Sequence, residues 1–192
     1  SFFATMQYQT DLIQMKTGPG TVQGYRMSDL GVDTIWHVDA FSLSAMDLLV
    51  ERDKRKPADS ITYRPMLTGI LMNLPFKFTL GRIDLTNSRI RYNEISDKTG
   101  KEGSIWFTAM DATVRNIRNM NLTEKDSLRI NARTKLMNEG DLRFSFRQSY
   151  TDSLQGFFML ARMSKMDLNA LSPLLFPLFN LRIDKGVADS LW

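Results

Sequence analysis

The stretch "LPFKFTLGRIDLTNSRIRYNE", residues 74–94, alternates apolar and polar residues but changes phase twice. The apolar residues of one side occupy even positions, then odd positions, then even positions again. They are Phe76, Phe78 and Leu80, then Ile83 and Leu85, then Ile90 and Tyr92. Alternation of period two predicts a β-strand. The phase changes fall at Gly81-Arg82 and Asn87-Ser88, where glycine and asparagine tolerate the bulge geometry that adds one residue and increases twist.

A long strand with two bulges predicts a sheet that bends, and similar patterns fill most of the chain. The expected strands cover residues 2–16, 21–28, 33–52, 74–94, 104–117, 128–137, 142–149, 154–166 and 181–192. The second half of 33–52 is also compatible with a helix, but the alternation in residues 37–44 favours a strand. Short polar connections rich in turn residues separate the strands. We therefore expect a mainly β fold, a curled antiparallel meander that forms a half-barrel or β-groove with an apolar concave face.

Two segments interrupt the strand pattern. Residues 63–75, "YRPMLTGILMNLP", fit either a short helix or an irregular crossover. Residues 167–179 predict a short helix, because Asp167 and Ser172 suit an N-cap, Pro173 suits the first helical position and Pro177 limits the length. A helix this apolar must be buried, and we expect it at the mouth or on the concave face of the sheet.

Composition sets broad limits on function. The 192 residues are 43% hydrophobic and carry a net charge of +4, as in an ordinary globular protein. No cysteine is present, so disulfides and cysteine nucleophiles are excluded. No apolar run is long enough to predict a transmembrane helix. The arginines mostly alternate with apolar residues, which indicates a solvated sheet face rather than a nucleic-acid surface, with weak attraction to anionic headgroups left open.

Residues that could support catalysis are scattered. His37 is the only histidine, so no histidine metal cluster can form, and no G-x-S-x-G motif surrounds any serine. The aspartates are spread over different strands, and no two are held together by sequence spacing. We expect no catalytic residues, metal or cofactor. A carboxylate pair formed across strands for acid–base catalysis is the enzymatic alternative.

Methionine and phenylalanine are abundant, with twelve of each. Flexible, polarisable methionine suits surfaces that adapt to varied apolar shapes. The two interpretations are ordinary core packing and an apolar groove for acyl chains.

From about residue 74 onward the chain resembles the AsmA-like family of bacterial cell-envelope proteins. Three parts show the resemblance: the opening stretch of residues 74–94, the strands through "DLRFSFRQS" and the ending "MDLNALSPLLFPLFNLRIDKGVADSLW". The ending is similar to a family pattern in which a strand, a short helix and a second strand follow one another.

The resemblance implies a non-catalytic periplasmic protein, anchored in the inner membrane by a helix outside this chain. The family is linked to outer-membrane assembly and to phospholipid transport along an apolar β-groove. The partners implied are phospholipid acyl chains and other envelope proteins, with no nucleic acid. The alternative is a structural or protein-interaction β-domain with a closed core.

On this interpretation residues 1–192 are one β-rich segment of a longer protein, with leading strands and a linker over 1–73 and the AsmA-like unit over 74–192. Both ends lie inside alternating patterns, which favours an excised segment. The expected groove residues are the inward apolar side chains of the strands and of the 167–179 helix. They are Phe76, Phe78, Leu80, Leu142, Phe144, Phe146, Phe158, Leu160, Leu174, Leu175 and Phe179.

Overall fold

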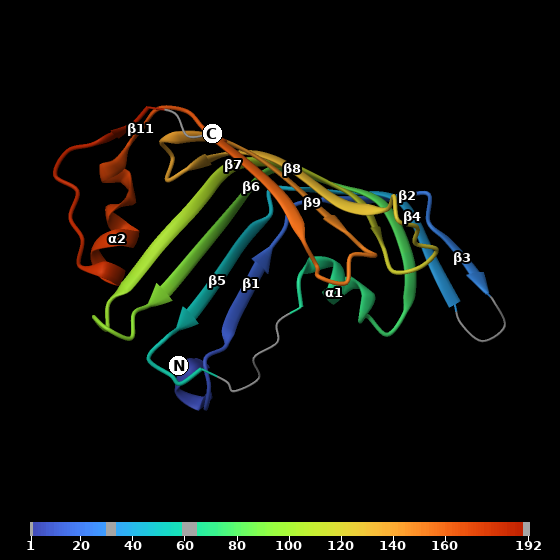
Figure 1. Ribbon diagram of the computed structural model, residues 1–192, viewed down its shortest axis with the longest axis horizontal. Helices are drawn as coiled ribbons and strands as arrows, with labels where there is room; N and C mark the ends of the chain where they lie inside the picture. Colours follow the sequence, from blue (N-terminus) through green and yellow to red (C-terminus); the bar gives the residue numbers. More distant parts are fainter. Residues whose placement is uncertain (1, 30–33, 59–64, 190–192) are drawn as a thin grey trace.

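The computed structural model describes residues 2–29, 34–58 and 65–189, and the chain is mainly β (Figure 1). Ten strands form one large mixed, largely antiparallel sheet, and two short strands pair separately. The sheet is open and is not strongly curled. The expectation of a mainly β fold is therefore confirmed, and that of a curled half-barrel is wrong.

The strands and helices follow the sequence patterns in most places. The sheet contains β1 (Asp11–Lys16), β2 (Gly20–Gln23), β3 (Arg26–Asp29), β4 (Thr34–Ser44), β5 (Asp47–Asp53), β6 (Lys77–Ile95), β7 (Glu102–Arg118), β8 (Ser127–Leu136), β9 (Gly140–Ser149) and β10 (Phe157–Met163). The separate pair is β11 (Met166–Asp167) with β12 (Val187–Ala188). The helical elements are η1 (Phe2–Thr5), α1 (Leu67–Met72), η2 (Leu168–Leu171) and α2 (Ser172–Phe179).

Strands β6 to β10 form the antiparallel meander that the sequence predicts. Strands β4 and β5 instead run parallel to β6. The chain between β5 and β6 contains α1 and crosses back before β6 begins, so β6 runs in the same direction as its predecessors. The purely antiparallel topology is therefore wrong for this part of the sheet.

Three further sequence predictions fail locally. The strand expected over 33–52 breaks at Ala45 and Met46, between β4 and β5. The strand expected over 2–16 begins with η1, and only β1 pairs with the sheet. Of residues 181–189, only the two residues of β12 form a strand, and 190–192 lie outside the described residues.

The second phase change of the opening stretch is a bulge that extends across three strand paths. Asn87 has a positive φ of 46°, and the register between β6 and β7 shifts on both sides of Ser88. Ala45 lies beside it with φ 50°, and Ala109 of β7 lies on its other side with φ 46°. We call the line through Ala45, Asn87 and Ala109 the crease. The irregularities are aligned, so the sheet bends at this line and does not curl progressively.

Side chains satisfy the backbone groups that the crease removes from the regular ladder. The Ser88 hydroxyl accepts a hydrogen bond from the Met46 N–H at 3.3 Å and donates to the Thr86 carbonyl at 3.2 Å. The Asp111 carboxylate accepts from the Asn87 N–H at 2.9 Å. Ser88 is almost fully buried. Hydrogen bonds therefore hold the backbone of the crease in a defined conformation.

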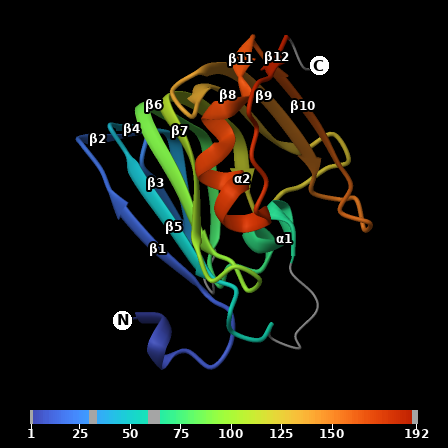
Figure 2. The ribbon, with the colours of Figure 1, turned by 90° about the vertical axis from the view of Figure 1, so that its left-hand side faces the viewer.

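The crease divides the sheet into two panels that diverge in Figure 1. The large panel contains β2, β3, β4, the first half of β6, the second half of β7, and β8 to β10. The small panel contains β1, β5, the second half of β6 and the first half of β7. Both α1 and α2 lie against the same face of the sheet, which we call the inner face (Figure 2).

The core lies between the large panel and α1. Ile117, Leu128 and Phe146 are buried in one cluster, against which Leu71 of α1 packs. The N-terminal N–H groups of α1 are satisfied from other segments. The fully buried Gln148 side chain accepts from the Thr68 N–H, and Gln155 accepts from the Met66 N–H. These bonds fix α1 to the end of the sheet where β9 turns into β10.

The crease predicts a specific response to substitution at Ala109, whose side chain is exposed. Ala109→Gly removes the steric cost of a positive φ and should raise the free energy of unfolding by about 1 kcal/mol. Ala109→Val adds a branched carbon in the same conformation and should lower it by about 2 kcal/mol. Urea denaturation of the two variants measures both effects. A regular strand conformation at this position would give the opposite order, with valine the more stable.

Candidate functional site

The inner face of the large panel is built from rows of apolar side chains that cross the whole sheet. Residues paired directly across neighbouring strands project from the same face. One row crosses seven strands and contains Val22, Phe41, Ile83, Val114, Ile130, Phe146 and Met159. The next row contains Gly20, Leu43, Leu85, Ala112, Ala132, Phe144 and Ala161. No residue of either row is polar.

Only part of this apolar surface is covered. Seven strands about 4.8 Å apart span about 29 Å. The six residues of α1 measure only about 9 Å along the helix axis. Among the described residues no second sheet packs against this face. The large panel is therefore a single layer whose apolar face is only partly covered by α1.

One exposed apolar part of the inner face lies at strand β10. Phe157 and Met159 are 52% and 56% exposed. The Phe157 ring stacks on Phe146 with centroids 5.5 Å apart, and Phe146 stacks on Phe144 at 6.5 Å. We call Phe144, Phe146, Phe157 and Met159 the apolar strip.

Helix α1 extends the exposed apolar surface next to the apolar strip. Leu67, Ile70 and Met72 are each at least 40% exposed, while Leu71 packs into the core. The helix is connected to the β9–β10 segment through the bond from the Met66 N–H to Gln155 at 3.0 Å. An exposed apolar surface of this kind is typical of sites that bind apolar ligands or partners.

The groove residues predicted on β6 and β9 lie on the inner face. Phe78, Leu80 and Phe144 pack against the core cluster, and Phe146 belongs to it. Leu142 shares this face through the alternation of β9. Phe76 precedes β6, is 48% exposed and lies 5.6 Å from Phe78 between ring centroids.

The facing predicted for β10 is wrong. Phe158 and Leu160 pair with Arg147 and Ser145, which places them on the outer face. The inner-face residues of this strand are Phe157, Met159, Ala161 and Met163. The sequence "FFMLARM" is apolar at both phases over its first half, so alternation alone could not decide which phase faces inward. The pairing with β9 decides it.

The predicted helix at 167–179 is present, but it lies over the small panel. Asp167 caps η2 by accepting from the Asn169 N–H at 2.9 Å, and α2 begins at Ser172. Leu178 is buried against Gly103 of β7, where an added Cβ would lie 2.6 Å from the leucine side chain. Phe179 is 66% exposed.

The predicted helix residues do not join the apolar strip. Leu174 also lies close to Gly103, through its backbone carbonyl, and Leu175 is half-buried. Helix α2 packs mainly against β7. Leu174, Leu175 and Phe179 therefore lie over the small panel, and the sequence prediction had joined two separate regions.

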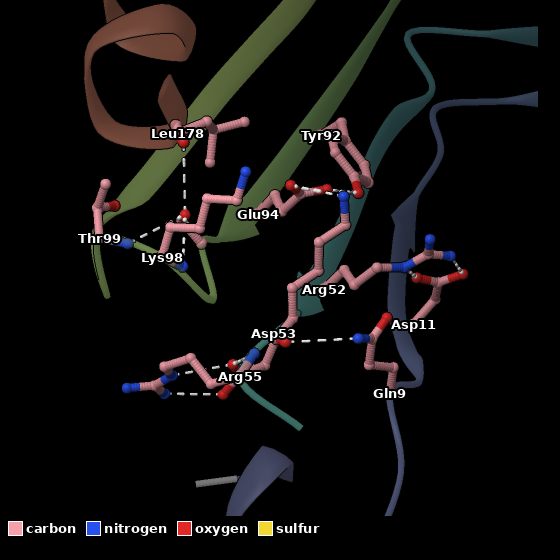
Figure 3. Close-up of polar contacts among 12 residues, drawn as sticks. Gln9, Asp11, Arg52, Asp53, Arg55, Tyr92, Glu94, Lys98, Thr99 and Leu178 are labelled. Carbon is pink, nitrogen blue, oxygen red and sulfur yellow. Dashed lines mark hydrogen bonds and ion pairs between the residues drawn. The ribbon is translucent and has the colours of Figure 1, made fainter. Parts of the chain in front are cut away.

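The inner face becomes polar at the far end of the small panel (Figure 3). Arg52 forms a two-pronged ion pair with Asp11 at 2.6 Å. Glu94 accepts from the Tyr92 hydroxyl at 2.6 Å and pairs with Lys54 at 2.9 Å. These contacts fasten β1 and β5 to β6 and mark the limit of the apolar surface.

The pKa shifts in this polar cluster follow from its packing. Burial, and then the hydrogen bond to Glu94, raise the pKa of Tyr92 to about 12. The neighbouring Arg55 guanidinium lowers the pKa of Asp53 through a hydrogen bond to its carboxylate. Each acid of the cluster has a basic partner. Among residues 2–29, 34–58 and 65–189 no group of three acidic or histidine side chains could hold a metal.

His37 lies between two hydroxyl groups, and it has no acidic partner among the described residues. Its ring nitrogens lie 3.0 Å from the Ser28 hydroxyl and 2.9 Å from the Thr79 hydroxyl. The described part of the chain contains no helix long and apolar enough to cross a membrane.

A hollow lies on the outer face, opposite to the predicted groove. It has a volume of about 740 Å³ and crosses β6 to β9 between two rows of polar side chains. One row is Asp84, Thr113, Asn131 and Ser145, and the other includes Asp111, Arg133 and Arg143. The sequence prediction placed no site here, because cross-strand register is not visible in the sequence.

No protein-family model, curated protein or solved structure matches this chain. The resemblance to the AsmA-like family therefore stays a prediction from the sequence.

Tyr92 gives the cluster a pH signature. Its pKa is higher in the folded chain than the usual value of 10. The neutral phenol therefore stabilises the fold below about pH 10, and this contribution is lost as the pH rises toward about 12. We expect the free energy of unfolding to fall less steeply over that interval in Tyr92→Phe than in the unsubstituted chain. Urea denaturation at several pH values measures the free energy of unfolding of both chains. An equal dependence on pH in the two would contradict the raised pKa of Tyr92.

Proposed function

We propose that this chain is a non-catalytic segment of a cell-envelope protein whose inner face shields phospholipid acyl chains. The observation that supports it most is the pair of apolar rows crossing seven strands with only a short helix over them. In water such a surface costs about 25 cal/mol for each Å² left exposed. A covering ligand or partner would remove this cost.

The dimensions of the inner face suit an acyl chain. One leaflet of the hydrocarbon core of a bilayer is about 15 Å thick, and the apolar rows extend about 29 Å. The aromatic side chains at the β10 end and the methionine beside them offer a broad, adaptable contact. The charged cluster at the tip of the small panel marks where an apolar ligand must end.

The localisation that we propose follows from the family resemblance. The protein acts in the periplasm, is held at the inner membrane by a region outside this chain and contributes to outer-membrane assembly by phospholipid transport. Other envelope proteins are the further partners. Cofactors, metals and nucleic acid have no part in this proposal.

A second candidate is a protein-interaction domain, and the sheet edges favour it. Within the described residues β1 pairs only with β5, and β10 pairs only with β9. Both edge strands have exposed apolar residues, among them Ile13, Met15 and Phe157. An unpaired, apolar edge strand can accept a strand from another chain. In this alternative the partner is a protein and the inner face is covered by it.

The acyl-chain proposal is tested by substituting the two faces of β10 separately. Phe157→Ser with Met159→Ser removes apolar area from the inner face, and Phe158→Ser with Leu160→Ser removes a similar area from the outer face. The probe is phenylnaphthylamine, a neutral dye that fluoresces in apolar surroundings, displaced by a short-chain phosphatidylcholine. We expect the inner-face pair to weaken lipid binding about tenfold, because each side chain contributes part of its transfer free energy.

The outer-face pair is the matched control, since it alters the same strand and should leave displacement unchanged. Loss of binding in both variants to the same extent would indicate damage to β10 itself. No dye or lipid binding by the unsubstituted chain would contradict the acyl-chain function and favour the protein-interaction alternative.

A further inference from the structure

The outer face of the large panel contains a row of arginines that the sequence does not reveal. Arg82, Arg115, Arg129 and Arg147 are directly paired across β6, β7, β8 and β9. Four neighbouring strands place their guanidinium groups along a line of about 14 Å. Phe158 of β10 pairs with Arg147 and ends the row with an exposed aromatic ring. We call these five residues the arginine row.

Most of the row has no acidic partner. Arg82 forms an ion pair with Asp84 at 2.6 Å. Arg115, Arg129 and Arg147 form no ion pair or hydrogen bond with any described residue, and all three are exposed. Like charges directly opposite each other in a sheet destabilise it. An anionic partner on this face would convert that repulsion into attraction.

The charge excess extends beyond the row. The outer positions of β8, of β9 and of β7 from Asp111 to Arg115 carry six basic and two acidic residues. The basic ones are Arg115, Arg129, Arg133, Lys135, Arg143 and Arg147, and the acidic ones are Asp111 and Asp141. Both acids already pair with basic residues of this set, Arg133 and Lys135. The excess is +4, as large as the net charge of the whole chain.

Two shallow hollows lie beside the unpaired part of the row. The larger, of about 650 Å³, has Glu124, Lys125, Arg129, Arg147 and Phe158 among its lining residues. The smaller, of about 240 Å³, shares Arg129, Arg147 and Phe158. Both hollows therefore combine guanidinium donors with phenylalanine rings, Phe157 and Phe158 in the larger and Phe146 and Phe158 in the smaller. Guanidinium groups bind phosphate oxygens in paired geometry.

The geometry points to an anionic phospholipid surface as the occupant of the arginine row. The cations lie on one helix-free face of the large panel, and the apolar residues lie at its edge, on β10 and on the preceding turn, where Leu154 is 89% exposed. Proteins that bind a charged bilayer surface place cationic side chains over the headgroups and apolar side chains at the margin.

The same residues fit a nucleic acid less well. Single-stranded nucleic acids need aromatic rings interleaved with the cations to stack successive bases. Here the row has one ring, at its end, and the neighbouring outer row is Asp84, Thr113, Asn131 and Ser145. An aspartate in that position would repel a phosphate backbone.

This surface is separate from the inner face, so it does not depend on the acyl-chain proposal. Together, the outer face would hold the chain on a charged bilayer while the inner face contacts an apolar ligand.

The test is sedimentation of the 192-residue chain with vesicles of phosphatidylcholine alone or with about a third phosphatidylglycerol. We expect binding only to the anionic vesicles, and binding that weakens as ionic strength rises. Arg129→Gln with Arg147→Gln should reduce binding about 25-fold, since each arginine near such a surface contributes about fivefold. Thermal denaturation checks that this double variant is folded, which its exposed positions favour.

The matched control is Lys98→Gln with Lys185→Gln, which lowers the net charge by the same two units at exposed positions away from the row. It should reduce vesicle binding less than threefold. Met159→Ser alone, on the inner face and outside both hollows, should keep vesicle binding within about twofold, which distinguishes failure of vesicle binding from failure of the acyl-chain proposal.

Three results would overturn the proposal. Equal loss in the row variant and the lysine control would show that only net charge matters. Displacement by inorganic phosphate beyond that by sodium chloride of equal ionic strength would assign the row to a soluble phosphate. Tighter binding to a single-stranded oligonucleotide than to the anionic vesicles would assign it to nucleic acid.

Discussion

The crease is the constraint on which the rest of the structure depends. Ala45, Asn87 and Ala109 take up left-handed backbone conformations at neighbouring points of adjacent strand paths. Each costs free energy in a residue other than glycine, and together they are tolerated because Ser88 and Asp111 satisfy the displaced backbone groups. Strands β6 and β7 pass through the crease, so both panels share this long pair of strands. The crease also keeps one face apolar across the bend, because the added residue restores the phase of the alternation on both strands.

The two faces of the large panel follow from that register. Apolar rows and polar rows alternate across the sheet, so a one-residue slip in any strand would place arginines among the apolar side chains. The first phase change, at Gly81, is handled in the same way. Leu80 pairs with Ile117 and Ile83 pairs with Val114, with Asn116 left-handed between them. The Tyr150 hydroxyl donates to the Asn116 carbonyl at 2.6 Å and so fixes this second irregularity to the turn after β9. Apolar and polar side chains are therefore arranged regularly across the strands as well as along each strand.

Local features of the fold could be predicted from the sequence, and features that depend on pairing could not. The bulge at Asn87 and the capped helix at 167–179 follow from residue types whose backbone preferences are strong. The parallel pairing of β4 and β5 with β6 joins strands that lie far apart in the sequence, which no local pattern specifies. The facing of Phe158 could not be decided because its strand is apolar on both sides. The arginine row was not visible in the sequence for a related reason, since its arginines are separated by 14 to 33 residues and meet only through the register.

The central claim is that the inner face of this single-layered sheet is the surface that meets acyl chains. Because the chain has no cysteine, one can be placed at each of residues 157 to 160 in turn and labelled with a small fluorophore. A short-chain phosphatidylcholine with a nitroxide on its acyl chain then reports contact by quenching. The account predicts alternating quenching, strong at 157 and 159 and weak at 158 and 160. Uniform quenching along the four positions, or none at any of them, would contradict it.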